Sequence, residues 1–261
     1  MTRATRMNRR EVLVSGAVAS LTLGAPRSAW AMGGPVVGVA DLLIPGLANP
    51  RRGAMVSLLE SVAEASSVAP MAEVPEVSPA SQELFSWPFV TLFGARGFDP
   101  LPDEAVGNLR LYLREGGFLF IDDASGVRDS DFDRSVRREC ARILPGAQLA
   151  PIGRDHAVYR AFFMVRAATG RVVVRPAMEG MWLGDVTPVL YSGNDLAGAL
   201  LRGSDGRPAL EVVPGGEAQR LEATKLAMNI VLFALTSNYK RDAVHVRTLM
   251  SRMRRQGGYA E

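Results

Sequence analysis

Three short polar clusters carry the side chains that could do chemistry in this sequence. Asp122 and Asp123 follow the apolar run Phe118 to Ile121, Asp155-His156 contains one of two histidines in the chain, and Asn194-Asp195 follows the apolar run 186–191. Paired carboxylates can ligate a metal or orient a base, and a histidine can act as acid, base or ligand. The candidate ligand-binding residues are therefore Asp122, Asp123, Ser125, Asp155, His156, Asn194 and Asp195.

Each cluster also has a structural interpretation. One of the paired acids can cap the turn at residues 124–126 while the other is solvated. His156 has three aromatic neighbours in the sequence, Tyr159, Phe162 and Phe163, which could bury it as a packing residue. Asn194-Asp195 can cap the helical segment 196–201. Both interpretations stay open, so the sequence predicts no definite catalytic residue and leaves any metal or cofactor unknown.

Alternating strands and helices must position these clusters. Apolar runs at 36–44, 89–93, 118–121 and 186–191 predict strands, and a proline-containing polar stretch, 70–81, predicts a loop. Helical periodicity recurs over 52–66, 103–115 and 132–143, and a last long helix is expected from Gly215-Gly216 to Asn238-Lys240. This order predicts an α/β fold with a mainly parallel sheet covered on both faces. Ligands then bind at the carboxyl ends of the strands.

Residues 1–31 have the pattern of a cleavable signal peptide. Arginines precede an apolar run from Val12 to Ala25, and Ala29-Trp30-Ala31 suits a signal peptidase that cleaves before Met32. Arg9-Arg10 resembles the twin-arginine signal of the pathway that exports folded proteins. An ordinary secretory leader or an uncleaved anchor is the alternative. We expect a periplasmic or secreted protein with one α/β domain at 32–245, a basic tail at 246–261 and no transmembrane span in the mature chain.

Charge and cysteine content exclude several classes of protein. The leader holds five of the arginines and one glutamate, so the mature chain has a net charge of about −1 although the whole chain is at +3. This balance argues against a nucleic-acid-binding protein. The single cysteine, Cys140, excludes an intramolecular disulfide and a cysteine-based zinc cluster. The basic C-terminal segment could meet an acidic partner or lipid headgroups, or it could be a solvated tail.

Several blocks of sequence resemble a bacterial family described only as domain of unknown function 4159. The blocks are WPFVTLFG, LRLYLREGGFLFIDDASG, FDRSVRRECARILPG, RDHAVYRAFF, VLYSGNDLAGA, PGGEAQRLEATKLAMNIVLFALTSNYK and HVRTLM, and the resemblance covers roughly residues 36–252. It implies a flavodoxin-like, class I glutamine amidotransferase-like three-layer sandwich with no established activity. Ala157 and Ala95 depart from the family pattern, which has proline and, in some members, histidine at these places.

The resemblance does not bring an amidotransferase reaction with it. That reaction needs a cysteine on a sharp strand-to-helix turn, whereas Cys140 lies within a predicted helix on the apolar face of Phe132, Val136 and Ile143. Two hypotheses remain. The first is a non-catalytic module that binds a ligand, or a protein partner in the cell envelope, through its strand-end loops. The second is a carboxylate- or metal-dependent hydrolase or transferase that uses the strand-end acids.

Overall fold

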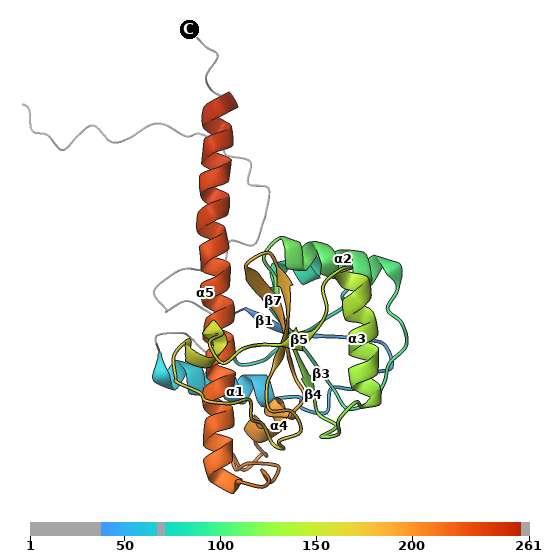
Figure 1. Cartoon of the computed structure of the whole chain (residues 1–261), viewed down its shortest axis with the longest axis vertical. Coiled ribbons are helices and arrows are strands. Elements are labelled where there is room, and N and C mark those ends of the chain that lie inside the picture. Colours follow the sequence, from blue (N-terminus) through green and yellow to red (C-terminus); the bar gives the residue numbers. More distant parts are fainter. Residues whose placement is uncertain (1–37, 67–70, 257–261) are drawn as a thin grey trace, which may run out of the picture. The chain divides into compact units, whose positions relative to one another are not determined.

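Seven strands form one sheet in the part of the chain that the structure, a computed structural model, describes: residues 38–66 and 71–256, with side chains through Thr236 (Figure 1). The strands are β1 (Val39–Leu42), β2 (Glu76–Val77), β3 (Phe89–Gly94), β4 (Phe118–Asp123), β5 (Ala150–Pro151), β6 (Glu179–Leu183) and β7 (Val186–Ser192). Their order across the sheet is β2-β1-β3-β4-β7-β6-β5. The first five strands in this order are parallel to one another, β6 is antiparallel to β7, and β5 is antiparallel to β6.

Helices cover both faces of this sheet. They are α1 (Ala54–Ala65), α2 (Asp103–Arg114), α3 (Asp131–Ile143), α4 (Leu196–Leu200) and α5 (Gly216–Gln256), with short 3-10 helices η1 (Gln82–Ser86) and η2 (Ala157–Arg160). One core lies between the sheet and α1, α4 and α5, and the other between the sheet and α2 and α3 (Figure 1). Alternate residues of β4 pack in the two cores. Phe118 and Phe120 lie in the first core, and Leu119 and Ile121 lie in the second.

The predicted α/β architecture with a mainly parallel sheet is confirmed. Strand order β2-β1-β3-β4-β7 is the 2-1-3-4-5 order of flavodoxin-like sheets. After β1 the chain forms the neighbouring strand on one side, β2, and after β3 it forms the neighbouring strand on the other side, β4. The strands predicted by their apolar runs are all present. Two-residue β2 lies in the stretch expected to be a loop, and β5 and β6 were not predicted, because two residues carry no period and β6 begins with Glu179-Gly180.

Register brings the carboxyl ends of three strands to one level. Phe93 of β3 pairs with Asp122 of β4, and Asp122 pairs with Ser192 of β7. The polar residues that follow β4 and β7 therefore start from the same edge of the sheet. This edge is the one at which doubly wound folds bind ligands.

The expected end of the last helix at Asn238-Lys240 is wrong. Helix α5 continues to Gln256, because neither glycine nor proline interrupts the sequence before Gly257. The side chains of residues 237–256 and the whole of the expected leader lie outside the described residues, so the leader, its cleavage before Met32 and the domain limits stay predictions. Among the described helices, none combines the length and hydropathy needed to cross a membrane.

Candidate functional site

Asp195 stands on a sharp turn between β7 and α4. Its backbone is in the left-handed region, with φ 51° and ψ 54°, and its Oδ1 accepts a hydrogen bond from the Gly198 amide at 3.1 Å. An aspartate tolerates this conformation better than most residues because its short polar side chain can bond locally. The turn directs the carboxylate into the protein, where it is completely buried.

Two arginines neutralise the Asp195 carboxylate. Arg51, in the segment between β1 and α1, donates from Nε to Oδ1 at 2.7 Å and from Nη2 to Oδ2 at 2.6 Å. Arg171 donates from Nε to the same Oδ2. Both side chains are mostly buried, so the two guanidiniums and the carboxylate form an ion-paired cluster. Asp195 is thus committed to a structural ion pair.

Asp122 lies beside Asp195 and holds the start of α4. Its Oδ1 accepts from the Leu196 amide at 2.9 Å and its Oδ2 from the Ala197 amide at 2.7 Å. Complete burial, and next the charge of Asp195, raise the pKa of Asp122 to about 7, although the two amide donors act in the opposite direction. Both oxygens of Asp122 are therefore occupied by the protein's own backbone.

Asp123 organises the turn and the helix that follow β4. Its Oδ1 accepts from the Ser125 amide at 2.9 Å, which is the turn-capping role considered for one of the paired acids. Its Oδ2 accepts from Ser130 Oγ at 2.5 Å, and Ser130 in turn caps α3 by accepting from the Asp133 amide. The other half of that structural interpretation is wrong, because Asp122 is buried rather than solvated.

Asn194 fixes a neighbouring loop. Its Oδ1 accepts from the amides of Val174 and Arg175 at 2.8 and 2.7 Å, and its Nδ2 donates to the Arg175 carbonyl at 2.8 Å. Three hydrogen bonds from one buried side chain hold residues 174–175 against the turn after β7. Asp122, Asp123, Ser125, Asn194 and Asp195 do come together at this edge, and four of them serve turns, helix starts and loop contacts with buried side chains.

His156 and Asp155 lie elsewhere. His156 Nδ1 accepts from the Val158 amide at 3.2 Å, so in the neutral ring Nε2 carries the proton, and Nε2 lies 3.1 Å from Thr187 Oγ1. Burial lowers the pKa of His156, and its ring packs on Phe233. Thr187 precedes Ser192 by five residues on β7, about 16 Å along an extended strand. His156 is therefore remote from Asp122, and Asp155 beside it is exposed.

No metal cluster or activated thiol accompanies these residues in the described part of the chain. Nowhere in it do three or more His, Cys, Asp or Glu side chains form a group suited to a metal. Cys140 is buried in α3 among apolar side chains, as predicted, and burial raises the pKa of its thiol to about 12. A thiol in this state is not a nucleophile near neutral pH.

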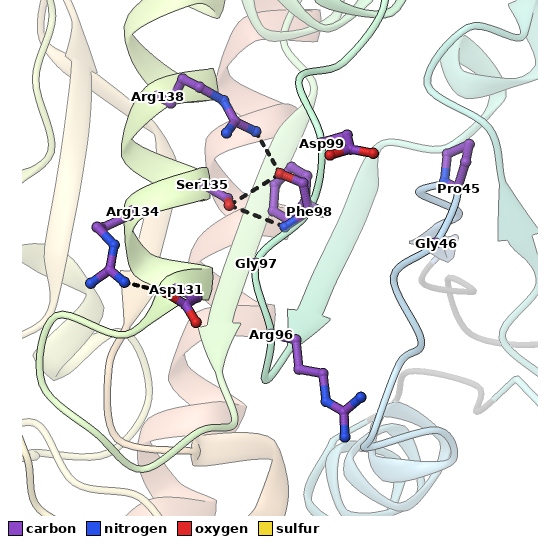
Figure 2. Close-up of a pocket in the computed structure, with 10 residues that line it drawn as sticks. All are labelled: Pro45, Gly46, Arg96, Gly97, Phe98, Asp99, Asp131, Arg134, Ser135 and Arg138. Carbon is purple, nitrogen blue, oxygen red and sulfur yellow. Dashed lines mark hydrogen bonds and ion pairs between the residues drawn. The ribbon is translucent and has the colours of Figure 1, made fainter.

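A cleft lies at the same edge of the sheet, next to β4, where β1 and β3 end. Figure 2 shows it between the Pro45-Gly46 turn that follows β1 and the loop from Arg96 to Asp99 that follows β3, with helix α3 along its side. Its volume is about 730 Å³, within the range of small-molecule sites. Because β1 and β3 lead to opposite sides of the sheet, this cleft lies at the topological switch point, where doubly wound folds bind ligands.

Guanidinium groups outnumber carboxylates in the lining of this cleft. Its charged residues are Arg96, Arg134, Arg138, Asp99 and Asp131. Arg138 Nη2 donates to the Phe98 carbonyl at 2.7 Å, Ser135 Oγ accepts from the Phe98 amide at 3.1 Å, and Arg134 pairs with Asp131 (Figure 2). Arg96 is exposed and has no ion-pair or hydrogen-bond partner among residues 38–66 and 71–236. The Arg96 guanidinium is thus available to bind a ligand in the switch-point cleft.

The arginines at Asp195 and in the switch-point cleft were not among the predicted site residues. Arg51 and Arg171, which neutralise Asp195, follow no strand directly, and no spacing links them to it. Arg96 did leave a signal, because Gly94-Ala95-Arg96-Gly97 directly follows a predicted strand. A cation in the loop directly after an apolar strand is typical of the strand-end positions where α/β folds bind ligands, and Arg96 could have been added to the candidates for this reason.

Comparison with known proteins agrees with the resemblance of the sequence blocks. The family model "Domain of unknown function (DUF4159)" matches residues 46–235. The chain belongs to this family. The DUF4159 match includes β3, β4, β7 and the cleft loop that follows β3, while β1 and Pro45 lie just before its first residue. No curated protein shows a significant match to the chain.

Proposed function

We propose that this DUF4159 protein is a non-catalytic binding module that takes a small anionic ligand in the switch-point cleft. The observation that carries the proposal is the exposed Arg96 guanidinium, without a described partner, in a cleft at the topological switch point. Arg134 and Arg138 add positive charge from α3. Guanidinium groups suit carboxylates and phosphates because they donate paired, charge-assisted hydrogen bonds.

The wider setting of the proposal rests on the sequence. The twin-arginine-like leader supports export of the folded chain to the periplasm or beyond, and the flavodoxin-like strand order is compatible with an amidotransferase-like superfamily. A binding role fits the position of the one cysteine, Cys140, which is buried within α3 and not on a strand-to-helix turn. A protein partner in the cell envelope is the ligand class to test if small anions fail.

The alternative, a hydrolase or transferase that uses the strand-end acids, has less support. It needs Asp122, Asp123 and a histidine near one another, whereas His156 contacts the opposite end of β7. Asp122 and Asp195 are also bonded on both carboxylate oxygens by protein donors. We therefore do not propose a catalytic role for these acids.

Thermal unfolding with a panel of anions tests the binding proposal. Inorganic phosphate, citrate and succinate are added separately to the parent chain, to Arg96→Gln and to the control Arg207→Gln, whose side chain is exposed elsewhere. A ligand at a hundredfold its dissociation constant stabilises by about 2.7 kcal/mol, a shift of several degrees for a domain of this size. We expect one anion to shift the parent and the control but not Arg96→Gln.

Two results would contradict the proposal. An equal shift in Arg96→Gln would place the anion outside the cleft. A shift with divalent cations that Asp122→Asn and Asp123→Asn abolish would instead support the metal-dependent alternative.

A further inference from the structure

Two large apolar side chains project from the loop that follows η2. The loop, residues 160–166, begins at the last residue of η2. In it Phe162 is 50% exposed and Met164 is 80% exposed, whereas Val165, which follows Met164, is buried. Phe163 packs partly against the core on the α5 side of the sheet. The side chains of Phe163 and Val165 therefore turn inward, and the outward side chains between Arg160 and Arg166 are apolar.

Buried contacts hold the loop in this arrangement. Asn229 of α5, completely buried, accepts from the Phe162 and Phe163 amides at 3.0 and 2.8 Å and donates to the Phe163 carbonyl at 2.8 Å. The Val165 amide donates to the Tyr159 carbonyl at 2.8 Å. An internal amide side chain with three bonds to one loop fixes the loop backbone. The exposure of Phe162 and Met164 is thus built into the fold.

Three arginines flank these apolar side chains in the sequence. Arg154, Arg160 and Arg166 are exposed, and none has an ion-pair partner within the described part of the chain, while Asp155 is the one acid between residues 154 and 166. Helix α5, which clamps the loop through Asn229, continues into a segment whose sequence carries six lysines and arginines and one aspartate between residues 240 and 256. The exposed arginines near the loop and the basic sequence at the end of α5 suit an anionic partner.

We propose that the loop of residues 160–166 docks the protein on a bilayer of anionic phospholipid. Phe162 and Met164 enter the interfacial region, and Arg154, Arg160 and Arg166 contact headgroup phosphates. Apolar side chains that project between cations suit a bilayer, which takes up apolar groups below a negatively charged surface. Each arginine near such a surface strengthens binding roughly fivefold. This surface is independent of the switch-point cleft, so either proposal can fail alone.

Sedimentation with vesicles tests the docking surface. The full chain is mixed with vesicles of phosphatidylcholine alone or of equal parts phosphatidylcholine and phosphatidylglycerol. We expect sedimentation with the anionic vesicles and little with the neutral ones, and a loss of binding as salt is raised. Phe162→Asp with Met164→Asp should weaken binding by tenfold or more, and Arg160→Gln with Arg166→Gln by a similar factor. The control pair Val127→Asp with Val173→Asp, also exposed, should bind as the parent does.

A local probe separates the loop from the basic segments at the two ends of the chain. With Trp30, Trp87 and Trp182 replaced by phenylalanine, the tryptophan fluorescence of Phe162→Trp should shift to the blue with anionic vesicles and be quenched by lipids brominated on their chains, while Val127→Trp in the same background should show neither change. The proposal is overturned if the chain does not bind anionic vesicles. It is equally overturned if the aspartate pair binds as tightly as the parent, or if Phe162→Trp is not quenched while the protein is bound.

Discussion

At the scale of single residues, the buried Asp195 is the side chain whose loss should matter most for stability. Asp195→Asn keeps a side chain that tolerates the left-handed backbone but leaves the guanidiniums of Arg51 and Arg171 without their carboxylate. Breaking a buried ion pair from one side costs about 3 kcal/mol or more. We expect urea unfolding to show a loss of this size. Asp205→Asn, in an exposed pair with Arg207, should unfold as the parent does.

Asp122 should make stability fall as the pH rises. Its pKa in the folded chain, about 7, lies above its ordinary value of 3.8, so the folded state binds the proton more tightly than the unfolded state. The stabilisation from this group is fully present below about pH 4 and is lost as the pH rises through 7. Urea midpoints of the parent and of Asp122→Asn, measured from pH 4 to pH 8, test this.

The quantity to compare is the difference in free energy of unfolding between the parent and Asp122→Asn at each pH. It should narrow with rising pH, because asparagine does not titrate. A difference that widens instead would mean that the Leu196 and Ala197 amides keep Asp122 ionised throughout and outweigh its burial.

At the scale of elements, β3 and α3 approach so closely that only glycine fits at position 94. A Cβ on Gly94 would lie 2.2 Å from Cε2 of Phe132, whose side chain is completely buried. Gly94→Ala should therefore destabilise the fold by roughly 1–3 kcal/mol. The same substitution at Gly107, inside α2 with open space around the new methyl, should stabilise by roughly 0.5–1 kcal/mol. Equal signs for the two changes in thermal unfolding would contradict this packing.

Sequence periodicity predicted the elements that bury an apolar surface and not the ones that lack it. Strands β3, β4 and β7 are continuous apolar runs, and α3 places Phe132, Val136 and Cys140 on one face, so the α/β order could be read directly. Strand β2 has only two residues and therefore shows no period, and the polar residues at 238–240 do not end α5, which continues to Gln256.

The candidate site was predictable only as far as the strand ends. Asp122, Asp123 and Asp195 were expected at one edge of the sheet and lie there, but their occupation by Arg51, Arg171 and the α4 amides joins segments far apart in the chain. No spacing rule reveals such pairs. For the same reason the switch-point cleft, which needs the order of β1 and β3 in the sheet, could not be placed from the sequence.

At the scale of the whole molecule, the leader should decide where the protein is found. Arg9→Lys with Arg10→Lys should leave the precursor in the cytoplasm of a bacterium with a twin-arginine pathway, because that pathway reads the pair. Arg3→Lys with Arg6→Lys conserves charge in the same way and should not affect export. Fractionation shows the location, and mass spectrometry should find Met32 as the first residue of the exported chain. Export of both variants would point to an ordinary secretory leader.

The pairing of β4 with β7 also governs the order in which the chain can fold as it leaves the ribosome. Strand β4 is central in the finished sheet, but its partner β7 begins at Val186, and Asp195 reaches Arg51 across 144 residues of chain. Until that segment has been synthesised, β4 is an unpaired edge and a template for aggregation. Chains truncated before Val186 should therefore aggregate, whereas chains that include β7 and the Asp195 turn can close the sheet.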